Sequence, residues 1–281
     1  MKPVLISLIY LFISGIMVTL SKFSFEKISQ YKLDEQIKEK NFAPVLSFCG
    51  YMLGIICILA GAYIGPSGMS FKADLLLFVL YSFVGILLMN FSNIVTDKFL
   101  LYKFSTKKEI IEDKNVGTAA VHFGIYTATG LIIAACVNGE YGGILSSVVY
   151  YVLGMLFLFL FLKIYDKIIP YSIHEELEKD NYAVGIALGG NILAIGIILM
   201  KATLGDFSDL RQSMILYFVD LSSIILLLPS LRYILGNLII RTVNINSEIK
   251  NNNIAAGLAE FITVVCFALL IFFMVDFSSV V

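Results

Sequence analysis

Charged side chains are scarce in this sequence, and their scarcity excludes one broad class of protein. Asp, Glu, Lys and Arg together account for 15% of the 281 residues, whereas hydrophobic residues account for 59%. A soluble domain of this composition would have too few polar side chains to cover its surface. The net charge of −1 points to no particular partner, and we expect no nucleic acid among the partners.

Histidine and cysteine are also rare, which bears on catalysis and on metal binding. The two histidines, His122 and His174, form no HExxH-type helix face, and the sequence contains no GxSxG elbow. The four cysteines all fall inside long apolar stretches, without the spacing of a disulfide framework or a zinc site. We therefore expect neither an enzyme nor a protein with a bound metal or cofactor.

Long apolar stretches, in contrast, occupy most of the chain. About 20 predominantly apolar residues are needed to cross the roughly 30 Å of hydrocarbon in a bilayer. Eight stretches satisfy this requirement, so the sequence predicts an all-α, polytopic membrane protein with eight transmembrane helices. The predicted spans are Pro3–Leu20, Phe42–Ile64, Leu75–Val95, Val116–Val137, Tyr141–Leu162, Tyr182–Met200, Met214–Leu231 and Ile254–Val275. No small-x-small cleavage site follows the first stretch, which we therefore interpret as a retained span.

A short pattern recurs four times along the chain. "DEQIKEKNFAP", "KEIIEDKNVGT", "EELEKDNYAVG" and "SEIKNNNIAAG" each end a charged linker with an asparagine and continue into an apolar span. These repeat asparagines are Asn41, Asn115, Asn181 and Asn253. Their spacings of 74, 66 and 72 residues predict four parallel two-span units within one integral membrane domain. The units are residues 1–66, 67–138, 139–204 and 205–281, and we expect a pseudo-symmetric bundle about the membrane normal.

Lysine and arginine are concentrated in the linkers. The linker side carries 16 of them, whereas the other side carries four: Lys2, Lys72, Lys201 and Arg211. Because Lys and Arg stay preferentially on the cytoplasmic side of a membrane, the linkers are predicted to be cytoplasmic and both termini to lie outside. The linkers themselves are predicted to form short amphipathic helices that rest on the headgroup boundary.

Small residues follow each repeat asparagine at a helical spacing. Offsets +2, +6, +9 and +13 fall on one face of a helix, and 14 of the 16 residues there are Gly, Ala, Ser or Cys, including Gly50, Gly124 and Gly190. In lipid, helix association depends on close van der Waals approach, so small-xxx-small packing is expected to make the second spans inner helices. The asparagine is predicted to cap free amide donors where the membrane helix begins. The glycines of "GIALGG" lie well inside a span, which excludes a phosphate-binding loop.

A few polar residues fall inside the predicted spans and are the candidate functional residues. Glu260 and His122 both lie at offset +7, and Asp220 lies near the middle of its span. Offset +7 points about 130° away from the small-residue face, so we expect Glu260 and His122 to face a neighbouring span, a cavity or lipid. Asn90 and Asn191 add uncharged polar groups.

These residues allow two hypotheses. In the first, Asp220, Glu260 and His122 line a path for protons or small cations through a ring of repeats, since intramembrane ionisable groups are costly and often functional. In the second, which we favour, the acids are protonated or hydrogen-bonded and hold helices together. The polar groups are few and are not repeated in every unit.

The sequence also resembles a known family. "FLKIYDKIIPYSIHEELEKDNYAVGIALGG" and "IKNNNIAAGLAEF" are similar to bacterial inner-membrane proteins catalogued as domain of unknown function 350. The usual member has four spans in two such units, so this chain looks like a tandem fusion. The resemblance implies a bacterial inner-membrane location, a repeated helical architecture and a role in envelope maintenance, and it brings no catalytic residues with it.

Together these features predict a non-enzymatic structural or envelope-stress protein of the inner membrane. Its linkers would form a docking face for a peripheral cytoplasmic membrane-stress protein, and its other partner would be the lipid bilayer. The alternative function is a channel or transporter for protons or small cations, built from parallel repeats. The sequence does not decide between a monomer and a homo-oligomer.

Overall fold

Helices form every regular element in the described part of the chain. The computed structural model describes residues 3–65, 67–68, 70–99, 107–138, 143–204, 211, 214–215, 217–219, 221–222 and 243–274. The long helices are α1 (Pro3–Ser29), α3 (Phe42–Ile64), α4 (Phe71–Phe99), α5 (Val116–Asn138), α6 (Gly143–Ile168), α8 (Tyr182–Thr203) and α11 (Ile254–Met274). The short linker elements are α2 (Leu33–Lys38), the π-helix η1 (Lys108–Glu112), α7 (Ile173–Glu178) and α10 (Ile245–Lys250). No strand occurs among these residues.

Seven of the described helices are long and apolar enough to cross a membrane. They coincide with seven of the predicted spans and extend some of them, because α1 continues to Ser29 and α6 to Ile168. The eighth predicted span, Met214–Leu231, lies mostly outside the described residues, and Asp220 lies outside them entirely. The chain is therefore an all-helical, multi-pass membrane protein.

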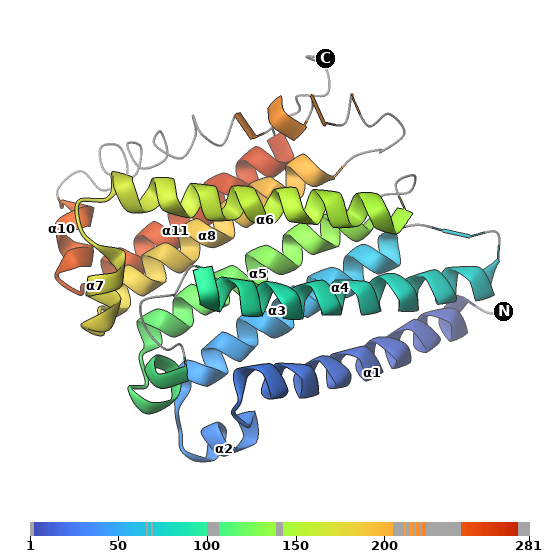
Figure 1. The fold of residues 1–281 in the computed structure, drawn as a ribbon, viewed down its shortest axis with the longest axis horizontal. Coiled ribbons are helices and arrows are strands. Elements are labelled where there is room, and N and C mark those ends of the chain that lie inside the picture. Colours follow the sequence, from blue (N-terminus) through green and yellow to red (C-terminus); the bar gives the residue numbers. More distant parts are fainter. Residues whose placement is uncertain are drawn as a thin grey trace.

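The second spans form a row rather than a ring. Helix α3 packs on α5, α5 on α8, and α8 on α11, so that α3 and α11 stand at the two ends (Figure 1). The first spans α1, α4 and α6 form a second layer, with α4 against α3 and α5, and α6 against α5 and α8. The linker helices α2, α7 and α10 all lie at the same end of the long helices (Figure 1).

Glycines set the distance between neighbouring helices of the row. A Cβ at Gly190 would lie 2.5 Å from the Cα of Phe261 in α11, and a Cβ at Gly257 would lie 2.5 Å from the carbonyl oxygen of Ala183 in α8. At Gly185 the added atom would overlap the backbone of Gly117 in α5. Backbones this close leave no room for a side chain, and therefore none for a pore, along these contacts.

Neighbouring inner helices meet through unlike faces, which explains why the row is open. The small-residue face of one helix packs against a different face of the following helix: Gly50 meets Phe123, and Gly190 meets Phe261. None of the described helices follows α11 in the row, and its own small-residue face remains at the end, with Ile262 and Cys266 exposed. The pseudo-symmetric bundle expected from the sequence is therefore replaced, in the described part, by a heterologous array.

The four linkers share one backbone conformation just before the repeat asparagine. The preceding residue is left-handed in every unit, with φ of 55° at Lys40, 56° at Lys114, 56° at Asp180 and 60° at Asn252. This turn ends the linker helix and directs the chain into the membrane helix. In the second unit the linker holds one extra residue, and the π-helix η1 accommodates it.

Candidate functional site

The repeat asparagines are the centres of a hydrogen-bonded layer at the linker end of the molecule. Each donates its side-chain Nδ2 to the side chain of an acid or amide in its own linker. Asn115 donates to Glu109 Oε2 at 3.0 Å, and Asn181 donates to Glu176 Oε2 at 3.0 Å. Asn41 makes the equivalent bond to Gln36 Oε1, also at 3.0 Å. This bond joins the asparagine to a side chain five or six residues earlier and so holds the turn at the end of the linker together.

The same Nδ2 also reaches the linker of the next unit. Asn41 donates to the carbonyl oxygens of Ile110 and Ile111 at 3.3 and 3.2 Å. Asn115 donates to the carbonyl of Leu177 at 2.7 Å. Asn181 donates to the carbonyls of Ile249 and Lys250 at 3.1 and 3.0 Å. Each bond adds a donor to a carbonyl near the end of a linker helix and ties successive units together.

The asparagine Oδ1 provides a helix cap in some units. It accepts from the amide of Thr118 at 3.0 Å in α5 and from the amide of Val184 at 3.1 Å in α8. In the first unit the corresponding position is Pro44, which has no N–H, and Asn41 Oδ1 has no hydrogen-bond partner. Capping is therefore not the role shared by the repeat asparagines, whereas the Nδ2 bond to the linker is.

Sequence reasoning missed the residues that receive this bond, Gln36, Glu109, Glu176 and Glu248. The signal was present, because each lies five or six residues before its asparagine. A spacing of five or six residues matches neither the helical i+3 and i+4 neighbours nor a strand, so no local periodicity marks it. Only the left-handed turn brings the two side chains together.

Glu109 is buried at this layer, and burial affects its ionisation. Its side chain is 8% exposed. Burial raises the pKa of Glu109, the hydrogen bond from Asn115 partly opposes that rise, and the nearby carboxylates of Asp113 and Asp180 add to it. The structure thus favours the neutral carboxyl at this position more than water does.

Within the membrane, a second polar cluster joins three helices. Glu260 of α11 is fully buried, and its Oε1 accepts from Asn191 Nδ2 of α8 at 2.8 Å. The same oxygen accepts from the Tyr165 hydroxyl of α6 at 3.1 Å. Asn191 also bonds to the Tyr165 hydroxyl at 3.2 Å and to the carbonyl of Ala187 at 2.8 Å. Glu260 therefore faces two neighbouring spans.

His122 occupies a different cluster, in the first half of the chain. Its Nδ1 lies 3.3 Å from the Tyr126 hydroxyl, which donates to Asn93 Oδ1 of α4 at 2.7 Å. Asn90, also on α4, accepts from the Tyr51 hydroxyl of α3 at 2.8 Å. The rings of Tyr51 and Tyr126 pack edge to face, with their centroids 5.8 Å apart. The hydrogen-bonded pair of Asn90 and Tyr51 therefore lies next to the group formed by His122, Tyr126 and Asn93.

The structure thus brings some of the predicted residues together and separates others. Glu260 and Asn191 are in direct contact, whereas Asn90 and His122 belong to the other cluster. Asp220 lies outside the described residues, and the hypothesis of a continuous polar path stays a prediction. Among the described residues, no group of three or more His, Cys, Asp and Glu side chains could hold a metal ion.

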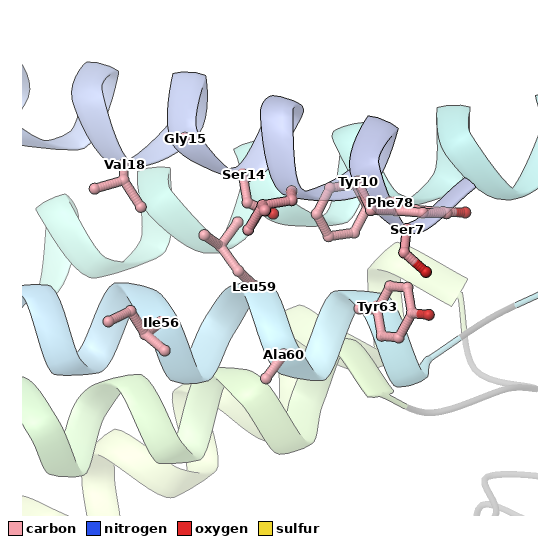
Figure 2. Close-up of a pocket in the computed structure, with 11 residues that line it drawn as sticks. Ser7, Tyr10, Ser14, Gly15, Val18, Ile56, Leu59, Ala60, Tyr63 and Phe78 are labelled. Atoms are coloured by element: carbon pink, nitrogen blue, oxygen red, sulfur yellow. The ribbon is translucent and has the colours of Figure 1, made fainter. Parts of the chain in front are cut away.

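An apolar groove of about 540 Å³ lies between α1, α3 and α4 (Figure 2). Tyr10 and Ser14 of α1 and Leu59 and Tyr63 of α3 face it, in the half of the molecule away from the linkers (Figure 2). Its lining contains no carboxylate, histidine or lysine. This chemistry suits a lipid-facing surface better than an ion site, and the groove shares no residue with the Glu260 cluster.

Comparisons with known proteins agree with the repeated architecture. The family described as Domain of Unknown Function (DUF350) matches residues 1–137 and again residues 140–275. A UPF0719 transmembrane protein of Aquifex aeolicus (strain VF5) is 29% identical over 253 residues, which cover 86% of this chain and 90% of the relative. The UPF0719 transmembrane protein YshE of Bacillus subtilis (strain 168) is 33% identical over 113 residues, covering 40% of this chain and 80% of the relative. No solved structure matches the chain.

Proposed function

The chain belongs to the DUF350 family, with two matches in tandem, and on that basis we propose that it is a non-enzymatic structural protein of the bacterial inner membrane. Its role is in envelope maintenance under stress. The linkers lie in the cytoplasm, the termini lie outside, and the linker end is a docking face for a peripheral membrane protein. The concentration of lysine and arginine in the linkers supports this orientation.

One observation carries the proposal: the asparagine bonds hold successive linkers in a fixed row. Asn41, Asn115 and Asn181 each tie their own linker to the next one, and all three side chains are buried. A transporter needs parts that move past one another, whereas this layer and the glycine contacts beneath it fix the units in register. A rigid row of short helices is suited to presenting side chains to a partner.

The exposed side chains of the row indicate the chemistry of that partner. In α7 and the turn after it, Glu175, Glu178 and Asp180 are exposed, together with Lys179. In α2 and the residues beside it, by contrast, the exposed acids Asp34, Glu35 and Glu39 are balanced by the exposed lysines Lys32, Lys38 and Lys40. Acidic groups therefore dominate the third linker, and the partner we propose carries a basic surface there.

Charge reversal tests the docking face. Cross-linking in intact membranes, followed by mass spectrometry, should recover a peripheral protein with the wild-type chain and lose it with the double variant Glu175→Lys, Glu178→Lys. Lys72→Glu is the matched control, since Lys72 is exposed at the start of α4, at the other end of the helices. Equal recovery with all three proteins would refute the docking face.

The buried carboxyl of Glu260 favours a second candidate function, conduction of protons or small cations. Vesicles containing the purified protein and a pH-sensitive dye would test it, because a path through Glu260 must respond to Glu260→Gln and, on the predicted path, to Asp220→Asn. Unchanged proton and cation flux in both variants would exclude this candidate.

A further inference from the structure

The two ends of the row of inner helices carry opposite halves of one interface. Within the chain this interface occurs three times, as α3 on α5, α5 on α8 and α8 on α11. Each time, the first helix contributes the residue nine positions after its repeat asparagine, and the next helix contributes the residue eight positions after its own. The pairs are Gly50 with Phe123, Gly124 with Gly189, and Gly190 with Phe261. One half of a further pair is therefore left on α11 and the other half on α3.

These two remaining halves are exposed. On α11 the position is Ile262, whose side chain is 53% exposed, and on α3 it is Cys49, which is also exposed. Both residues lie in the third turn of a membrane helix, counted from the linker end, so they are at matching depths in the bilayer. A second copy in the same orientation, placed at the end of the row, would bring Ile262 of one copy against Cys49 of the other.

The linkers show the same two unmatched ends. Inside the chain, the Nδ2 of a repeat asparagine donates to the carbonyl of an aliphatic residue four positions before the next repeat asparagine, namely Ile111, Leu177 and Ile249. In the first linker that residue is Ile37, and its side chain is 53% exposed, whereas Leu177 and Ile249 are fully buried. Asn253 is likewise exposed, although the other three repeat asparagines are buried. The acceptor is thus accessible at one end of the row and the donor at the other.

A third pair of positions joins the inner helices to the outer layer. The residue 17 positions after a repeat asparagine packs against a glycine in the first span of the following unit. Ile58 contacts Gly85 of α4 in this way, and Ile132 contacts Gly154 of α6. Both isoleucines are fully buried, whereas the corresponding residue of α11, Leu270, is 47% exposed.

The counterpart for Leu270 is the groove between α1 and α3 (Figure 2). Ser14 of α1 stands four residues after a tyrosine, as Gly85 and Gly154 do in α4 and α6. Ser14 and the adjoining Gly15 both line the groove, and a Cβ added at Gly15 would meet nothing within 4 Å. At Gly85 and Gly154 an added Cβ would collide with the isoleucine of the preceding inner helix. The groove therefore corresponds, in the first unit, to a contact that the second and third units make with the unit before them.

We propose that a second copy of this chain docks head to tail on the first, with α11 of one copy against α1 and α3 of the next. Leu270 enters the groove, and Ile262 lies against Cys49. At the linker end, Asn253 donates to the carbonyl of Ile37. The contact is heterologous, so it continues the row of inner helices from one copy into the next, as a closed ring or an open array. It does not depend on the proposed docking face, whose acidic side chains lie on and just after α7.

The contact between copies is wider than the contacts within one copy. Ile262 stands where the other three units have a glycine, and a larger side chain keeps two membrane helices further apart. The association is therefore tested in membranes, where the copies are concentrated and share one orientation, rather than after extraction into detergent.

Oxidative cross-linking provides the test. Ile262→Cys places a thiol opposite the native Cys49, and a disulfide forms where the two Cα atoms are about 4.4–6.8 Å apart. Membranes containing the full chain are oxidised with copper phenanthroline, and the products are separated on a non-reducing gel and mapped by mass spectrometry. We expect oligomers joined between position 262 and Cys49, at a yield at least about fivefold above wild type, because docking raises the effective concentration of the two thiols. Helices α3 and α11 stand at opposite ends of the row, so this disulfide joins two copies.

Leu160→Cys is the matched control. Leu160 is also exposed, and it lies about as far from the linker end of α6 as Cys49 lies from that of α3, but it belongs to the outer layer. This variant should cross-link no more than wild type. Adding Cys49→Ala to Ile262→Cys should abolish the product.

A groove-filling variant tests the contact from the other side. Gly15→Leu, added to Ile262→Cys, introduces a side chain where one copy has room for its Cβ, and it occupies the groove that Leu270 enters. The yield should fall to near that of wild type. An unchanged retention time in size-exclusion chromatography shows that the single copy still folds.

Three results would overturn the proposal. One is a yield from Ile262→Cys no higher than that from Leu160→Cys, which would leave the groove to lipid alone. Another is a product that joins position 262 of both copies, because it shows a back-to-back dimer. The third is undiminished cross-linking after Gly15→Leu is added.

Discussion

Asn181 and Ile249 are 68 residues apart in sequence, yet the side-chain Nδ2 of the first donates to the carbonyl oxygen of the second at 3.1 Å. This bond joins the third unit to the linker of the fourth. Asn41 and Asn115 make corresponding bonds to Ile111 and Leu177. The repeat asparagine is thus a connector between units in the first three cases, whereas the side-chain Nδ2 of Asn253 donates to Glu248 of its own linker.

Replacing the connector should therefore be more costly inside the row than at its end. Asn181→Ala removes the bonds to Glu176, Ile249, Lys250 and the Val184 amide, so that the buried Glu176 Oε2 loses this donor and the Val184 amide loses this acceptor. We expect a loss of about 2–4 kcal/mol of stability. The measurement is the thermal unfolding of the protein in detergent.

Asn253→Ala is the matched control, because Asn253 is exposed and bonds only within its own unit among the contacts described. For this variant we expect the stability of the folded protein to fall by about 1 kcal/mol or less. Equal destabilisation by the two substitutions would show that the bonds between units contribute nothing beyond local capping.

A methyl group at Gly185 should disrupt the contact between α5 and α8. Its Cβ would overlap the backbone of Gly117, which cannot move without displacing α5. We expect Gly185→Ala to destabilise the protein by about 1–3 kcal/mol or more, through overpacking. Gly15 of α1 is the control, since a Cβ there meets nothing within 4 Å. Gly15→Ala should be neutral or stabilise α1 by up to about 1 kcal/mol. Size-exclusion chromatography of both variants in detergent provides the check, because a misfolded variant changes its retention time relative to wild type.

The buried carboxyl of Glu109 predicts a pH dependence. Burial raises its pKa in the folded protein above the ordinary value of 4.5. The neutral form therefore favours folding, and this contribution is fully present below about pH 4.5 and is lost as the pH rises through the folded-state pKa. Glu109→Gln keeps an acceptor for Asn115, as Gln36 does for Asn41 in the first unit. The unfolding temperature of the variant, relative to wild type, should rise between about pH 4 and pH 7, and a constant difference would contradict the assignment.

The left-handed residue before Asn115 predicts a stabilising substitution. Lys114 has φ of 56°, a conformation that costs a lysine about 1 kcal/mol and that asparagine adopts more easily. The fourth unit already has Asn252 at the equivalent position, with φ of 60°. Lys114→Asn should stabilise the protein by about 0.5–1 kcal/mol, measured by thermal unfolding. Lys38→Asn, within helix α2, is the control and should be slightly destabilising.

Much of the fold follows from the composition and the repeat. Apolar length locates the seven described spans, because a helix that crosses hydrocarbon must satisfy its backbone internally and present apolar side chains. The phase of Gly50, Gly124 and Gly190 places them on one face of each helix, and these glycines do lie against a neighbouring backbone. Helical periodicity is a local property, so it can be read from one segment at a time.

The identity of each neighbour is not local, and only the tertiary structure decided it. The sequence placed Glu260 and Asn191 on their own helices, but their contact, with Tyr165 as the third member, depends on which faces of α6, α8 and α11 meet. The same holds for Asn181 and Ile249, which a left-handed turn and the close approach of two units bring together. Lipid-embedded helices gain little from burying apolar surface against one another, so their pairing is decided by steric fit and polar bonds. The sequence by itself determined where the helices are and which face of each second span carries small residues. The tertiary packing decided that these four second spans, α3, α5, α8 and α11, form an open row.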